Sequence, residues 1–300
     1  MHSRTTRLIL LAATALMLPV AVRAQYFGEN KVAYRDFDFR ELHTPHFDIY
    51  YYKAESTATA DVARMAERWY ERHSSTLRDT FPKKPIVLFS DPPAFSQQNI
   101  AYIPLGGPVG GVTEPIRNRA IIPMSPDYGQ TDHVLGHELV HTFQFDIAEN
   151  IRGPGGGGIG AFERIPLWVT EGMAEYLSLG RDDPNSAMYL RDAVLRNDIP
   201  SLKKLGRGNY FIYRWGQIFW AYIGGKYGDD IIPRLFRQAL RTGFESAVRN
   251  VLGMSSDSLS REMTAAIRRE VTPQINGLVR PEDVGDRPLQ PMSRRFGDID

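Results

Sequence analysis

Hydrophobic positions alternate in part of the first half of the chain and recur at helical spacing through most of the second half. Residues 37–53 alternate, are rich in Phe and Tyr and break at Thr44-Pro45, which predicts two strands joined by a turn. Short apolar runs predict further strands at 85–89 and 120–124. Helical periodicity covers 58–81, 131–145, 167–177, 187–197, 213–227, 231–242 and 258–272. This order of elements predicts an α+β fold of two lobes, a mixed N-terminal sheet lobe and an all-helical C-terminal lobe.

The predicted helix over residues 131–145 carries His137, Glu138 and His141. We expect Thr131 or Asp132 to cap its start. Because the two histidines are four residues apart, both rings leave the same face of the helix and can bind one metal ion. Glu138 is offset around the helix, where it can reach a water bound to the metal but not the metal itself. The alternative interpretation is two core histidines that flank a surface glutamate.

The third ligand of such a metal is not a later histidine, because none of the seven histidines follows His141. Ile147 occupies the position where the metzincin pattern places its third histidine. A carboxylate or a histidine from far upstream must then complete the site. His133 shares the helical face, but it lies about 12 Å along the axis from His141. We therefore expect His133 to be a surface residue of the first turn and not a ligand.

A second helical pattern, over residues 167–177, carries Glu171 and Glu175 on one face. Pro166 precedes it, and Leu167, Ala174 and Leu177 predict a buried stripe. Two like charges at this spacing are unfavourable unless a cation lies beside them. We expect Glu171 to bind the metal and Glu175 to accept the other ring N–H of a ligand histidine. A solvated pair of surface glutamates is the alternative.

These two motifs, HELVHTFQFD at 137–146 and LWVTEGMAEYLS at 167–178, resemble the gluzincin metallopeptidases. More narrowly, they are similar to the peptidase MA-like domains of secreted bacterial proteins, which a TolB-type β-propeller often follows. The similarity covers roughly residues 37–273. It implies one Zn²⁺ held by His137, His141 and Glu171, with Glu138 as the catalytic base. No β-rich repeat follows here, which leaves open whether the chain is a short version or a piece of a longer protein.

The resemblance also implies that residues 120–124 form the sheet edge along the cleft, where an extended peptide can pair. The tetrahedral oxyanion needs a hydrogen-bond donor, and Tyr213 is the first candidate and Tyr210 the second. Both could equally be core aromatics with surface hydroxyls. Glu114 is a weak candidate for holding the free amine of a substrate and is otherwise a plain loop acid. Exopeptidase and endopeptidase activity both stay open.

The N-terminus predicts export. Arg4 and Arg7 precede the apolar run 8–22, which reads as a signal peptide over residues 1–24, with an uncleaved anchor as the alternative. The peptidase domain then covers 25–275, and residues 276–300 are expected to be a linker or disordered tail. The glycine-rich stretch 152–160 is either a floppy insertion or a lid beside the cleft. A periplasmic or secreted protein without a membrane span is therefore expected.

Composition narrows the function further. A formal charge of +1 without a basic block argues against nucleic acid as a partner. The absence of cysteine excludes disulfides, thiol catalysis and Cys-ligated metals. We expect a secreted zinc-dependent metallopeptidase that hydrolyses peptide or protein substrates. The alternative is a catalytically silent zinc-binding module with a partner in the cell envelope. A structural zinc site is less favoured, because three ligands leave one position for water.

Overall fold

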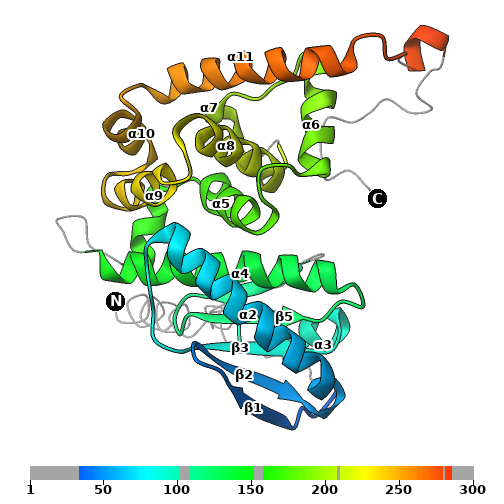
Figure 1. Ribbon diagram of the computed structural model, residues 1–300, viewed down its shortest axis with the longest axis vertical. Helices are drawn as coiled ribbons and strands as arrows, with labels where there is room; N and C mark the ends of the chain where they lie inside the picture. The colour runs from blue at the N-terminus through cyan, green and yellow to red at the C-terminus, as the bar shows by residue number, and fades with distance from the viewer. Residues whose placement is uncertain (1–33, 102–108, 152–157, 208–209, 280, 286–300) are drawn as a thin grey trace, which may run out of the picture.

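The computed structural model describes residues 34–101, 109–151, 158–207, 210–279 and 281–285. A sheet lobe is followed by a helical lobe, with α4 (Tyr128–Asn150) running along the boundary between them (Figure 1). The α+β prediction is thus confirmed. Among the described helices, none combines the length and the apolar composition needed to cross a membrane.

The sheet lobe contains β1 (Phe39–His43), β2 (Phe47–Tyr52), β3 (Lys84–Phe89), β4 (Val112–Glu114) and β5 (Arg119–Pro123). They lie in the order β1-β2-β3-β5-β4. The central pairs β2–β3 and β3–β5 are parallel, whereas the outer pairs β1–β2 and β4–β5 are antiparallel. The parallel pairs require crossovers, and α2 (Ser56–Leu77) makes the first of them.

Each face of this sheet has its own apolar cover, because successive side chains of a strand point to opposite sides. Ile86 and Leu88 of β3 belong to the main core, which α2 and α4 cover. Val87 and Phe89 point to the other face, where α3 (Pro92–Ser96) and a group of N-terminal aromatics cover them. Both faces of β3 are therefore apolar, and α4 covers the one that carries Ile86 and Leu88.

The helical lobe contains α5 (Leu167–Leu179), α6 (Pro184–Leu195), α7 (Leu202–Leu205), α8 (Ile212–Tyr227), α9 (Ile231–Thr242), α10 (Phe244–Leu252) and α11 (Ser256–Ile275). Short 3-10 turns lie at Lys53–Glu55, Ile159–Arg164 and Pro281–Val284. The closest helix crossing joins α5 to α8. A Cβ at Gly172 would lie 2.2 Å from the backbone of Gly216, so both positions require glycine. This crossing brings the first turn of α8 against the helix that carries Glu171 and Glu175.

The start of the helix that carries the two histidines differs from the predicted one. The helix with the two histidines begins at Tyr128 and is capped by Asp127, whose side chain accepts from the Gly129 amide. Thr131 and Asp132 are therefore not its caps, and Asp132 instead accepts hydrogen bonds from Arg68 and from Trp69 Nε1. The predicted helix start was wrong because the Asp132 side chain binds residues of α2 and does not cap α4.

Two further expectations were wrong. Leu167 is not part of a buried stripe, since 62% of it is exposed, although Ala174 and Leu177 are buried. Strand β5, which matches the predicted 120–124, is an inner strand, and the edge is β4. No sequence pattern marked β4, because its three residues lie in a stretch rich in glycine and proline.

Candidate metal centre

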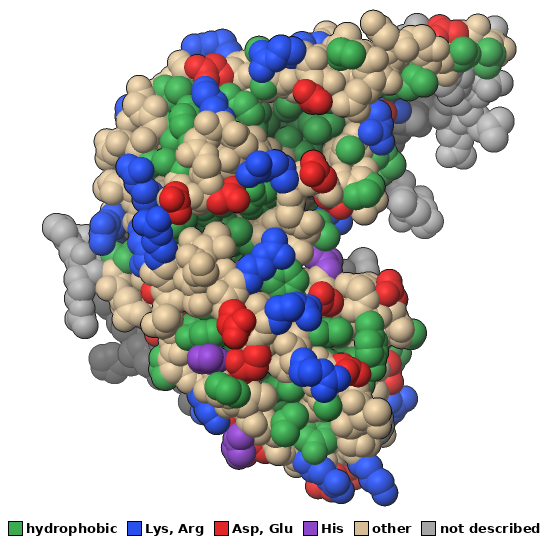
Figure 2. Space-filling view, viewed as in Figure 1, with side chains coloured by type: hydrophobic (Ala, Val, Ile, Leu, Met, Phe, Trp, Pro, Cys, Tyr) green, Lys and Arg blue, Asp and Glu red, His purple; other side chains and the backbone are tan. Residues whose placement is uncertain are grey.

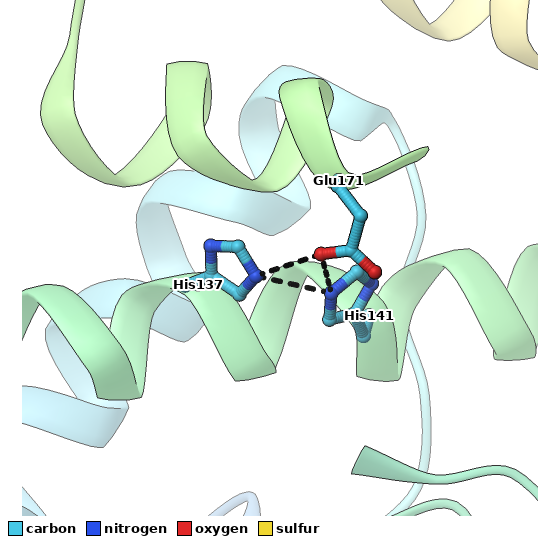
Figure 3. Close-up of side chains that lie close together, drawn as sticks. All are labelled: His137, His141 and Glu171. Atoms are coloured by element: carbon cyan, nitrogen blue, oxygen red, sulfur yellow. Dashed lines mark hydrogen bonds and ion pairs between the residues drawn. The ribbon is translucent and has the colours of Figure 1, made fainter. Parts of the chain in front are cut away.

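His137 and His141 of α4 and Glu171 of α5 converge on one point between the two lobes (Figure 3). His137 Nε2 lies 3.2 Å from Glu171 Oε2 and 3.2 Å from His141 Nε2, and His141 Nε2 lies 3.3 Å from Glu171 Oε2. The three atoms form a nearly equilateral triangle. A tetrahedral zinc ion with bonds of about 2.0–2.1 Å separates its ligand atoms by about 3.3–3.4 Å. The triangle therefore has the size of one face of a zinc coordination shell.

The chemistry of these donors also fits a cation. A carboxylate oxygen only accepts hydrogen bonds, and a ring nitrogen without a proton only accepts as well. Three such atoms within 3.3 Å of one another repel unless positive charge lies among them. Protons on the rings or a bound divalent metal ion can supply that charge.

The pKa shifts of His137, His141 and Glu171 also indicate that the site favours positive charge. Burial opposes charge on His137, but its interactions with Glu171 and Glu175 outweigh that cost and raise its pKa to about 10. Burial also opposes charge on His141, whose pKa the Glu171 carboxylate raises. Although Glu171 is buried, the facing histidines hold its pKa well below its usual range. The cluster thus attracts positive charge.

Glu175 contacts the far side of His137. Its Oε1 lies 3.1 Å from His137 Nδ1, and Arg214 NH1 of α8 lies 3.0 Å from its other oxygen. The Arg214 contact is an ion pair without hydrogen-bond alignment. Arg214 also donates to Asp183, the N-cap of α6, at 3.3 Å. A chain of alternating charges therefore runs from His137 through Glu175 and Arg214 to Asp183.

His133 is half-buried and not a surface residue of the first turn, as had been expected. It lies in the second turn of α4, and its Nε2 is 3.5 Å from Glu175 Oε1. It is not part of the triangle of His137, His141 and Glu171. Its contact with Glu175 depends on α5 and could not be read from α4 alone.

Gln144 supplies the partner of the other histidine. Its Oε1 lies 2.9 Å from His141 Nδ1, and its Nε2 donates to the carbonyl of Thr170 at 3.1 Å. Sequence reasoning missed this residue, although its spacing of three from His141 places both side chains on one face of α4. Arg214 and Thr113 were also missed, and they lie too far along the chain for any local pattern to connect them to the motif.

Glu138 is buried beside β4 of the sheet lobe. The hydroxyl of Thr113 lies 2.7 Å from Glu138 Oε2 and 2.9 Å from the Glu138 carbonyl oxygen. A Cβ at Gly111 would come within 3.0 Å of Glu138 Cγ and Oε1. Gly111, just before the strand, therefore leaves room for the carboxylate, and Thr113 of β4 binds one of its oxygens. These two contacts orient the Glu138 side chain.

The two candidate tyrosines lie in different surroundings. The Tyr213 ring centre is 6.1 Å from that of His137. Burial, followed by the charges of Glu171, Glu138 and Glu175, raises the pKa of Tyr213, so its hydroxyl keeps its proton at neutral pH. Tyr210 instead donates to Asp198 at 3.0 Å. The structure thus brings Tyr213 next to the cluster and directs the hydroxyl of Tyr210 to another partner.

Glu114 is sealed inside a turn. Its carboxylate accepts from the amides of Ile116 and Arg117 and from Arg119 Nε, the last at 3.0 Å. Only 2% of the residue is exposed. Because its oxygens are already occupied, Glu114 shapes the β4–β5 turn and is not available to hold the amine of a substrate.

Two other features of the described residues lie apart from this cluster. Glu41, His43 and Asp48 gather on the β1–β2 hairpin, where the first two are exposed. A cavity of about 1140 Å³ lies between α6, α8 and α11 and is lined by none of the cluster residues. The surface is indented between the two lobes (Figure 2). The predicted signal peptide (1–24), residues 152–157 of the glycine-rich stretch, and residues 280 and 286–300 of the predicted tail lie outside the described residues.

Neither the models of known protein families nor the curated proteins give a match to this chain.

Proposed function

We propose that this protein is an exported zinc-dependent peptidase. The observation that carries the proposal is the partly buried triangle of His137 Nε2, His141 Nε2 and Glu171 Oε2, with its edges of 3.2–3.3 Å. A fourth group, the carboxylate of Glu138, follows His137 in α4 and is not one of the three ligands. Three ligands with an adjacent carboxylate are typical of a catalytic zinc site and not of a closed structural one. Export rests on residues 1–24, and N-terminal sequencing of the protein recovered from cells tests it.

His137, His141 and Glu171 would hold the zinc ion. When bound, zinc supplies a Lewis acid that polarises a carbonyl and makes water more acidic. The remaining chemistry belongs to the side chains. Glu138 would accept a proton from the attacking water and return it to the departing amine. Thr113 holds one Glu138 oxygen, which supports a fixed direction for that transfer.

Tyr213 would stabilise the oxyanion that forms on the carbonyl. Its pKa is raised, so it keeps the proton that a hydrogen-bond donor needs. β4 is the last strand in the order of the described sheet, and an extended peptide can pair with such an edge strand. Gly111, just before this edge, also lies beside Glu138. These placements support a peptide substrate whose backbone lies along β4 with a carbonyl beside the base.

The test is digestion of a broad peptide mixture by the zinc-loaded protein beside Glu138→Gln, read by mass spectrometry. We expect Glu138→Gln to reduce cleavage by about a hundred- to ten-thousand-fold while zinc stays bound, because only the base is lost. The cut positions distinguish exopeptidase from endopeptidase activity. No cleavage by the wild-type protein, with one zinc ion bound, would favour the silent binding module instead.

A second variant separates the donor from the base. Tyr213→Phe should lower turnover by about a hundred- to a thousand-fold with unchanged zinc content, because it removes one oxyanion donor. Tyr210→Phe is the matched control, since its hydroxyl donates to Asp198, and it should leave turnover within about twofold. Equal turnover of Tyr213→Phe and wild type would remove Tyr213 from the mechanism.

A further inference from the structure

We infer that Gln144 is a positioning residue that holds the ring of His141 and the backbone of α5 in one arrangement, so that it sets the zinc affinity of the site. The inference rests on the zinc site proposed above. It concerns a residue that touches neither the metal nor the substrate in that proposal and acts through His141.

The argument begins with the carbonyl of Thr170. A carbonyl oxygen only accepts hydrogen bonds, so the Gln144 atom that lies 3.1 Å from it must be the amide nitrogen. The amide oxygen then faces His141 Nδ1 at 2.9 Å. Because an amide oxygen only accepts, Nδ1 must carry a proton. When the ring is neutral, as a metal ligand must be, its lone pair is therefore at Nε2, which is the atom that faces Glu171 and His137.

The same side chain joins the two helices that provide the ligands. Gln144 and His141 belong to α4, whereas Thr170 immediately precedes Glu171 in α5. Gln144 is fully buried, so water does not compete for either of its hydrogen bonds. One amide thus fixes the tautomer of His141 and the position of the turn that carries Glu171.

Gln144 carries no charge, and this suits a position that is surrounded by carboxylates and by a carbonyl. Glu138, Glu171 and Glu175 already put three carboxylates around the histidines. A glutamate at position 144 would still accept from His141, but when ionised it would face the Thr170 carbonyl with a second acceptor. An amide is the side chain of this length that satisfies both partners without adding charge.

The experiment compares Gln144→Met with Gln217→Met in the full chain. Gln217 is a similarly buried glutamine whose amide nitrogen donates to the Gly180 carbonyl at 2.8 Å. Both variants lose one buried amide and keep a similar volume. The zinc dissociation constant is measured by competition with a chromogenic chelator, and the melting temperature of the metal-free protein is measured beside it.

We expect Gln144→Met to raise the zinc dissociation constant by about 10- to 100-fold, as loss of a partner of a ligand histidine does. Gln217→Met should stay within about twofold of wild type even if both variants melt earlier. Gln144→Glu keeps the acceptor for His141, so its loss of affinity should be smaller than that of Gln144→Met. A dissociation constant of Gln144→Met within twofold of wild type, or an equal rise in both methionine variants, would overturn the inference.

If Gln144→Met does not fold, Gln144→Glu decides: affinity reduced by less than tenfold supports the positioning role, and a larger loss contradicts it. His137→Ala separates this outcome from a failure of the proposed site. Wild-type zinc binding that His137→Ala abolishes, together with unchanged binding by Gln144→Met, refutes only the role of Gln144. Wild-type protein that binds no zinc refutes both.

Discussion

His137 and His141 both direct Nε2 towards Glu171, but their Nδ1 atoms face different partners. On the His137 side, Glu175, Arg214 and Asp183 form a buried sequence of alternating charges. On the His141 side, the neutral Gln144 connects the ring to a backbone carbonyl. A charged network thus orients the ring of His137, and a single amide orients the ring of His141, four residues later in the same helix.

The difference follows from where each ring lies. His137 faces the crossing of α5 and α8, where a carboxylate can be buried because Arg214 reaches it from the neighbouring helix. His141 lies farther along α4, where the nearest partner of Gln144 on α5 is a carbonyl. A buried charge needs an opposite charge, whereas an amide needs only one donor and one acceptor. The charged network beside His137 therefore depends on α5, α8 and the start of α6, whereas Gln144 beside His141 depends only on α5.

The largest effect is expected from Arg214→Met, which removes the cation of Asp183 and leaves Glu175 paired with His137 and His133. Removing one partner of a buried ion pair costs about 3–5 kcal/mol of unfolding free energy. Chemical denaturation of the metal-free protein measures it. Arg181→Met is the control, because its pair with Asp229 is exposed and should contribute less than about 1 kcal/mol. Equal effects of the two variants would show that the charged side is not the more fragile one.

The pH dependence of zinc binding should be the next largest effect. The pKa of His137 is raised to about 10 and that of His141 is also raised, so zinc must displace at least one proton at neutral pH. We expect the zinc affinity to increase at least about tenfold for each pH unit between pH 6 and 8, measured by chelator competition. An affinity that does not change over this range would contradict the raised pKa.

The metal-free protein should respond to pH in the opposite sense. A histidine whose pKa rises from 6.5 to about 10 on folding stabilises the folded state fully below pH 6.5. That contribution is lost as the pH rises towards 10. Melting of the metal-free protein at pH 6.5 and 9.5 should therefore show lower stability at the higher pH, and the reverse order would contradict the assignment to His137.

The smallest effect is expected from His133→Ala. His133 meets Glu175 at 3.5 Å, but Arg214 meets the same carboxylate at 3.0 Å. Loss of this more distant partner should change the zinc dissociation constant by no more than about threefold, because Glu175 keeps His137 and Arg214. A change as large as that expected for Gln144→Met would mean that His133, and not Arg214, fixes Glu175.

Local periodicity was sufficient for part of this site. The spacing of His137 and His141, and of Glu171 and Glu175, places each pair on one side of a helix whatever the helix packs against. Predictions that depended on packing did less well. Asp132 resembles a helix cap in the sequence, yet it binds Trp69 and Arg68 of α2. Glu114 resembles an available loop acid, yet backbone amides and Arg119 occupy it.

The sequence by itself determined the two helices that carry the proposed ligands, because helical spacing is a property of the backbone. The tertiary structure alone decided that β4 is the edge beside Glu138, that Tyr213 lies next to His137, and that Gln144 and Arg214 hold opposite sides of the cluster. These relations depend on how separate elements pack: β4 lies against α4, and α5 lies against both α4 and α8.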